Sequence, residues 1–223
     1  MKRKSLEPPA AQGLGAGERA ALARLDTPGK IQAYLDGVPY STDTIYRCPR
    51  SVLADRKAHC FDGALLAACA LGELGHPPLI VDLRAVRDDD HVIAVFRRRG
   101  RWGAIAKSNV VGLRFREPIY ATLRELVMSY FELYYNTDGE KTLRSYSRPL
   151  DLREFDESDW RVDSSCLEEV VVRLDKAHHE ALLTDRMVGE LLPVDERSYH
   201  AGLLGADEAG LYAADRLRRK STG

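Results

Sequence analysis

Residues 59–85 read HCFDGALLAACALGELGHPPLIVDLRA, and this stretch decides most of the predicted fold. From Cys60 to Leu74 the chain is rich in alanine and leucine and carries an acidic residue in its first turn, which favours a buried helix. The Gly-His-Pro-Pro that follows ends a helix abruptly. Residues 79–86 (LIVDLRAV) are then apolar and partly β-branched, so the helix is predicted to lead directly into a strand.

Two more strands and a helix are predicted downstream. HVIAVF (residues 91–96) and WGAIAK (102–107) flank the turn-like RRRGR, which is typical of a hairpin. Residues 118–135 carry apolar side chains at helical spacing and are predicted to form a helix covering one face of the sheet. Together these elements indicate an α+β fold with a helix packed on an antiparallel sheet.

The segments before this core are short. Residues 1–17 combine prolines, glycines and a basic start, which predicts a flexible leader with order beginning near Glu18. Two short helices are expected at Glu18–Leu25 and Pro28–Leu35, the second capped by Thr27. Residues 37–50 suit a surface loop that walls a cleft.

The rest of the chain is predicted to be mainly helical. It is polar from Asn136 to Trp160, and an amphipathic helix then runs from Ser164 or Ser165 to Leu182. We therefore expect a single domain over residues 18–223, with a core at about 40–135 and a C-terminal helical extension at about 136–223.

Composition narrows the class of protein. The chain has 223 residues, of which 44% are hydrophobic and 30% charged, as in ordinary globular proteins. Lys and Arg total 33 against 34 for Asp and Glu, so there is no overall field to attract nucleic acid or an anionic membrane. The sequence shows neither a signal-peptide core nor a run long enough to span a membrane, and we expect a cytoplasmic protein.

Cys60 is the candidate nucleophile. The four cysteines, Cys48, Cys60, Cys69 and Cys166, lack CxxC pairing and are expected to be reduced thiols. Cys60 opens the predicted Ala-rich helix, where free N–H groups favour a thiolate and lower its pKa. The competing interpretation is an inert buried cysteine, as we expect for Cys48 and Cys69.

His91, at the start of a predicted strand, is the candidate base, although it could also be a strand-edge histidine satisfied by Asp90. An orienting partner for its ring should come from the neighbouring strand. A two-residue turn at Arg99 and Gly100 would place Ser108 opposite His91, and a turn one residue longer would place Asn109 there. We favour Asn109, because an amide accepts from an imidazole N–H, and keep Ser108 as the alternative.

No metal or cofactor is expected. His59 lies beside Cys60 and His178 beside His179, but no second pair of ligands stands at a useful spacing.

At this point HCFDGALLAACALGELGHPPLIVDLRA, DDDHVIAVF and GRWGAIAKSN together resemble the core of the transglutaminase-like, papain-related superfamily, over residues 55–110. The resemblance implies a nucleophilic cysteine opening a helix, then a histidine and usually an aspartate on adjacent antiparallel strands. The aspartate typically comes four residues after the strand's tryptophan. Four residues after Trp102 stands Ala106, so the usual acid is missing from its usual place.

The sequence thus predicts a thiol-dependent acyl-transfer enzyme that acts on an amide in a small molecule, peptide or protein through a Cys60 thioester. The acceptor is water or an amine. We expect one oxyanion donor from the Cys60 N–H and a second from the residues just before it, such as Arg56 or Lys57. Two alternatives are a binding or scaffold protein that has lost turnover, and a redox or metal-handling cysteine protein.

Overall fold

The computed structural model describes residues 13–212, which form an α+β domain with one antiparallel sheet. Seven strands make up this sheet in the described part of the chain: β1 (Leu79–Ala85), β2 (His91–Arg98), β3 (Arg101–Ile105), β4 (Arg116–Tyr120), β5 (Leu143–Ser147), β6 (Leu150–Asp151) and β7 (His179–Ala181). Their order is β4-β3-β2-β1-β5-β7, and β6 pairs with β1 outside this path.

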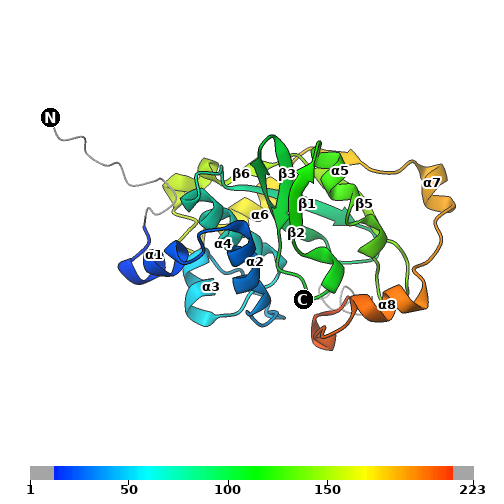
Figure 1. The fold of residues 1–223 in the computed structure, drawn as a ribbon, viewed down its shortest axis with the longest axis horizontal. Coiled ribbons are helices and arrows are strands. Elements are labelled where there is room, and N and C mark those ends of the chain that lie inside the picture. The colour runs from blue at the N-terminus through cyan, green and yellow to red at the C-terminus, as the bar shows by residue number, and fades with distance from the viewer. Residues whose placement is uncertain (1–12, 213–223) are drawn as a thin grey trace.

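Helices cover both faces of the sheet (Figure 1). The α-helices of the described residues are α1 (Ala16–Ala23), α2 (Pro28–Asp36), α3 (Pro49–Asp55), α4 (Cys60–Glu73), α5 (Leu123–Met128), α6 (Leu167–Asp175), α7 (Asp185–Gly189) and α8 (Glu196–Gly202), and α7 lies apart from the sheet. α4 packs against β2, with α2 and α3 beside it, and α5 packs on β3 and β4. Two hydrophobic cores result, one around α4 and one around α5.

The predicted central helix is confirmed, and its start is fixed at Cys60. The ring of His59 accepts from the N–H of Asp62 at 3.4 Å, and the Asp62 carboxylate accepts from the N–H of His59 at 3.3 Å. This reciprocal capping satisfies two N–H groups that a helix start leaves unpaired. Gly75, at φ 82°, adopts the left-handed conformation just past the helix end.

The predicted β2–β3 hairpin is also confirmed, but with the shorter turn. Arg99 and Gly100 both have positive φ, 51° and 79°, and Arg98 pairs with Arg101. Such a two-residue turn fits the twist of the strands. The longer turn that would have placed Asn109 opposite His91 is therefore wrong, and the ladder itself ends at the pair Ala94–Ile105.

Residues 118–135, predicted as one helix, are divided. Pro118 lies within β4, and α5 begins after Thr122, whose hydroxyl accepts from the N–H of Glu125 at 3.1 Å. β4 ends the strand order, and proline is tolerated on such an edge strand because it lacks only a hydrogen bond that faces outward.

The C-terminal part was predicted as a helical extension, yet it completes the sheet. β5 lies between β1 and β7, so the core does not end at residue 135. The predicted helix from Ser164 or Ser165 to Leu182 ends at Asp175, and β7 begins at His179. β5 is polar (LRSYS), so only pairing with its neighbours makes it a strand.

The first helix and the buried core begin before Glu18, earlier in the chain than the sequence predicted. Leu14 is buried in the core and α1 starts at Ala16, so the expected leader over 1–17 is too long at its end. Residues 1–12 of the predicted leader lie outside the described residues. The Thr27 cap is confirmed, because its hydroxyl accepts from the N–H of Lys30 at 3.2 Å.

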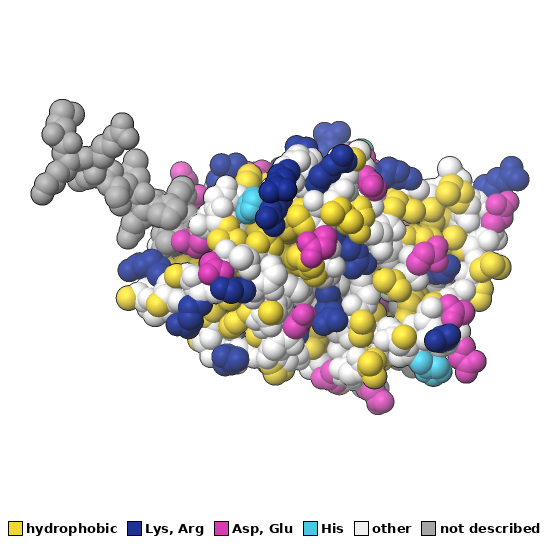
Figure 2. Space-filling view, viewed as in Figure 1, with side chains coloured by type: hydrophobic (Ala, Val, Ile, Leu, Met, Phe, Trp, Pro, Cys, Tyr) yellow, Lys and Arg dark blue, Asp and Glu magenta, His cyan; other side chains and the backbone are white. Residues whose placement is uncertain are grey.

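The face of the molecule seen in Figure 2 carries basic and acidic side chains interspersed with apolar ones. Between residues 13 and 212, no helix has both the length and the apolar character needed to cross a membrane.

Candidate active site

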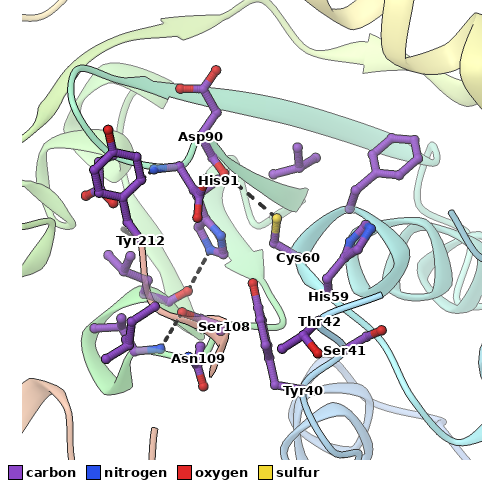
Figure 3. A pocket seen from close by; sticks show the side chains of 18 of the residues that line it. Tyr40, Ser41, Thr42, His59, Cys60, Asp90, His91, Ser108, Asn109 and Tyr212 are labelled. Carbon is purple, nitrogen blue, oxygen red and sulfur yellow. Dashed lines mark hydrogen bonds between the residues drawn. The ribbon is translucent and has the colours of Figure 1, made fainter. Parts of the chain in front are cut away.

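Cys60 and His91 line the same cavity, which has a volume of about 420 Å³ (Figure 3). Cys60 is the first residue of α4 and His91 the first of β2. The Cys60 Sγ lies 3.9 Å from the carbonyl oxygen of Asp90, the residue just before His91. The packing of α4 on β2 thus brings the predicted nucleophile to the start of the strand that carries the predicted base.

The Cys60 thiol is held in its neutral form. Burial raises the pKa of Cys60 to about 12, although the N–H of Val92 acts in the opposite direction. The nearby Asp62 and Asp89 also disfavour a thiolate. The expected lowering of this pKa by the helix N-terminus is therefore wrong, since loss of hydration outweighs it.

The His91 ring is also neutral, and its tautomer is fixed. The residue is only 5% exposed, and burial lowers the pKa of His91 to about 4. Nε2 lies 2.9 Å from the carbonyl oxygen of Leu113. A carbonyl oxygen only accepts, so Nε2 carries the hydrogen and the lone pair is on Nδ1, the ring nitrogen nearer the main chain.

Neither predicted orienting residue bonds to the ring in the described hydrogen bonds. The side-chain amide of Asn109 donates to the carbonyl of Asp207 at 2.8 Å and accepts from its N–H at 2.8 Å. Ser108 Oγ accepts from the N–H of Val110 at 2.9 Å. Both residues line the cavity, but the place expected for them is taken by Leu113, at the end of the 3-10 turn Val111–Leu113.

The sequence cannot indicate which backbone carbonyl accepts a hydrogen bond from a given side chain, because every residue has such a carbonyl. Sequence reasoning therefore searched side chains for the partner of His91 and missed Leu113. Only the path of the chain after β3 reveals it.

Tyr40 was also missed as a site residue. It pairs with Ala58 in a parallel bridge, which carries it beside the start of α4. Figure 3 shows its hydroxyl pointing up between the Cys60 and His91 side chains. Burial raises the pKa of Tyr40 well above 10, and the proximity of Cys60 adds to this. The phenol therefore stays protonated and can donate. Its only signal in the sequence was the loop 37–50, expected to wall a cleft.

Arg56 and Lys57, named as examples of residues that could supply a second oxyanion donor, are not among the residues that line the cavity. Arg56 ends α3 in the left-handed conformation, at φ 51°. Lys57 Nζ lies 3.0 Å from a carboxylate oxygen of Asp43.

The described residues contain no group of three or more His, Cys, Asp or Glu side chains placed to hold a metal ion. No protein-family model matches this chain, and a search of curated proteins finds no match either. What the cavity offers chemically is a thiol, a neutral imidazole and a phenol around one space.

Proposed function

We propose that the protein is a cysteine-dependent acyl-transfer enzyme that acts on an amide or peptide bond through a Cys60 thioester. One observation carries the proposal. The Leu113 carbonyl accepts the Nε2 hydrogen of His91, which leaves the lone pair on Nδ1, and the Cys60 sulfur lies 3.9 Å from the carbonyl oxygen of Asp90, the residue before His91. A nucleophile, a base and a group that orients the base are the parts such chemistry needs.

Because the Cys60 thiol and the His91 ring are both neutral at rest, proton transfer accompanies the attack of Cys60 on the substrate. When a substrate carbonyl enters, Nδ1 takes the thiol proton as Sγ bonds to the carbonyl carbon. The resulting imidazolium keeps its Nε2–H on the Leu113 carbonyl, and it returns the proton to the leaving amine as the C–N bond breaks. Water or an amine then attacks the thioester with the same base. Hydrolysis is the simpler outcome, since water needs no second binding site.

Two donors are available for the oxyanion. The N–H of Cys60 stands at the first position of α4, where a helix provides no acceptor for it. The Tyr40 hydroxyl, which points between the Cys60 and His91 side chains in Figure 3, supplies the second donor. Donors fixed in a site with little water stabilise the developing charge strongly.

The resemblance of residues 55–110 to the transglutaminase-like superfamily supports the proposal of a cysteine-dependent acyl-transfer enzyme. We propose that α4 and the antiparallel strands β1 to β3 correspond to the core of that fold. Here the third member of the triad is a main-chain carbonyl, in place of the aspartate usual in the family.

A thiol-reactive acyl probe tests the proposal. We expect it to label Cys60, and labelling to disappear in Cys60→Ser and to fall sharply in His91→Ala. Cys166→Ser is the matched control, because Cys166 is a free, partly buried cysteine outside the cavity lining, and it should label normally. An unlabelled Cys60 in a folded protein would overturn the proposal.

A binding protein without turnover is the second candidate. The observation that favours it is the pKa of Cys60 near 12 beside the pKa of His91 near 4, since both are far from neutral pH. In that case a ligand would bind in the cavity equally well after Cys60→Ser, and the acyl probe would react no faster with Cys60 than with a free thiol.

A further inference from the structure

Tyr40, whose hydroxyl points between Cys60 and His91 in Figure 3, borders two cavities. The first is the cavity of about 420 Å³ that contains Cys60, and the second, of about 390 Å³, lies beside the end of α2 and Lys107. Tyr40 and Asn109 line both. A side chain between two open spaces has fewer packing neighbours than one in a dense core, so its position depends on the contacts that remain.

Hydrogen bonds hold the main chain around Tyr40 but not its ring. The N–H of Ser41 donates to the Ala58 carbonyl at 3.0 Å, and the N–H of Ala58 donates to the Pro39 carbonyl at 3.3 Å. Within residues 13–212 the Tyr40 hydroxyl has no hydrogen-bond partner. The hydroxyl is therefore free to donate to a substrate, and the orientation of the ring depends on packing alone.

The main chain of Gly210 packs directly against this ring. A Cβ atom added at Gly210 would lie 2.8 Å from Cδ1 and 3.0 Å from Cε1 of Tyr40, and 2.9 Å from Nδ2 of Asn109. Carbon atoms in favourable contact are roughly 3.5–4.0 Å apart, so no side chain fits there unless a neighbour moves. The φ of Gly210 is not among the positive values, so glycine here provides space and not conformational freedom.

Gly210 is itself held in place by a compact turn that docks on Asn109. The Asn109 amide donates to the carbonyl of Asp207 and accepts from the N–H of Asp207, both at 2.8 Å. The N–H of Gly210 donates to the same carbonyl at 2.9 Å, and the Asp207 carboxylate accepts from the N–H of Ala209 at 2.9 Å. The turn 207–210 is thus fixed on one side by Asn109 and lies against Tyr40 through Gly210.

We propose that Gly210 is a positioning residue, whose main chain packs on the Tyr40 ring and keeps the Tyr40 hydroxyl directed at the carbonyl oxygen of the substrate. This inference rests on the proposed function, in which that hydroxyl is an oxyanion donor. The turn 207–210 belongs to the C-terminal part of the chain, far in sequence from Cys60 and His91. The site is therefore complete only when this turn is docked.

A small displacement of the ring is enough to remove the donor. Oxyanion donors act at roughly 2.7–3.1 Å from the oxygen. A methyl group at Gly210 forces Tyr40, Asn109 or the turn to move, and the second cavity offers space into which the ring can turn. Because Gly210 acts through Tyr40, its substitution should slow reactions of Cys60 that develop an oxyanion and spare those that do not.

Two reagents separate these reactions. With p-nitrophenyl acetate, Sγ of Cys60 bonds to the carbonyl carbon, an oxyanion forms, and p-nitrophenolate leaves as the C–O bond breaks, while the thiol proton passes to Nδ1 of His91. Iodoacetamide alkylates the same sulfur with loss of iodide and forms no oxyanion. Intact-protein mass spectrometry gives both rates, in a Cys166→Ser background that removes the other cysteine that is not fully buried.

We expect Gly210→Ala to slow acylation roughly tenfold or more and to leave alkylation within about threefold of the wild-type rate. Tyr40→Phe should slow acylation about 100-fold, and adding Gly210→Ala to it should slow acylation no further, because the hydroxyl is already absent. Gly189→Ala is the matched control, since a Cβ added there has no atom within 4 Å, and both of its rates should equal those of the wild type. Asn109→Ala releases the same turn without adding an atom, and it should also slow acylation more than alkylation.

The outcomes separate this inference from the proposed function. Wild-type acylation in Gly210→Ala would overturn the positioning role and leave the enzyme proposal standing. Equal slowing of acylation and alkylation would also overturn it, because Gly210 would then act on the thiol or on His91. If Gly210→Ala failed to fold, wild-type acylation in Asn109→Ala would overturn it in the same way. A wild-type Cys60 that is alkylated but never acylated would overturn the proposed function itself.

Discussion

The Nε2 of His91 and the carbonyl oxygen of Leu113 lie 2.9 Å apart, in a buried contact between residues 22 positions apart in the sequence. This contact fixes where the imidazole keeps its hydrogen. It also orients the His91 ring without a carboxylate or amide side chain. A carbonyl accepts a hydrogen bond but carries no full charge, so it stabilises an imidazolium less than an aspartate would.

The buried His91 should make stability depend on pH. Its folded-state pKa of about 4 lies below the ordinary value of 6.5, so between these values the unfolded chain binds more protons. The contribution of His91 to stability is therefore fully present above about pH 6.5 and is lost as the pH falls toward 4. Urea unfolding at pH 7 and pH 5 should show a loss of about 2 kcal/mol more in wild type than in His91→Gln.

The comparison with His91→Gln is needed because buried carboxyl groups change the pH dependence of stability in the direction opposite to His91. Burial raises the pKa of Asp62, Asp82 and Asp88 to about 6, so their contribution falls as the pH rises through the same range. Equal pH slopes in wild type and variant would contradict a neutral, buried His91. The ¹⁵N shifts of the ring at pH 7 should also show hydrogen on Nε2.

The resting Cys60 should behave as a thiol. With its pKa raised to about 12, its rate of alkylation by iodoacetamide should rise about tenfold per pH unit from pH 7 to 9, without a plateau. Mass spectrometry of wild type and Cys60→Ser separates this rate from that of Cys166. A fast rate that is constant from pH 5 to 7 would indicate a thiolate–imidazolium pair instead.

Tyr40 should affect turnover more than substrate binding. Removing its hydroxyl in Tyr40→Phe is expected to lower kcat roughly 100-fold, as loss of one oxyanion donor does. KM should change little, because the donor acts mainly on the charge that develops during reaction. Tyr120→Phe, on edge strand β4 and outside the cavity lining, should retain wild-type kcat. A Tyr40→Phe enzyme with normal kcat would remove Tyr40 from the mechanism.

Asn109 should anchor the C-terminal segment. Its reciprocal hydrogen bonds to Asp207 hold residues 203–212, several of which line the cavity. We expect Asn109→Ala to speed hydrogen–deuterium exchange in that segment, while Cys60 still reacts with the acyl probe. Ser108→Ala should leave the exchange unchanged. If Asn109→Ala abolished labelling as His91→Ala does, Asn109 would have to act on the base.

The sequence correctly predicted those helices, strands and turns whose structure depends on residues close together in the chain. The start and end of α4 follow from a cap and a Gly-His-Pro-Pro stop, and the β2–β3 hairpin from its turn. The α+β class followed from these elements. The polar strand β5 and the edge strand β4 were missed, because each becomes a strand only by pairing with a neighbour.

The sequence by itself determined that Cys60 opens a helix and that His91 opens a strand, since helix and strand starts are set by local capping and periodicity. The tertiary structure decided everything that depends on chain segments meeting across the cavity. It chose the Leu113 carbonyl over Asn109 as partner of His91 and placed Tyr40 beside Cys60. The physical reason is that burial and hydrogen bonding depend on which surfaces pack together, and burial here reversed the expected lowering of the Cys60 pKa.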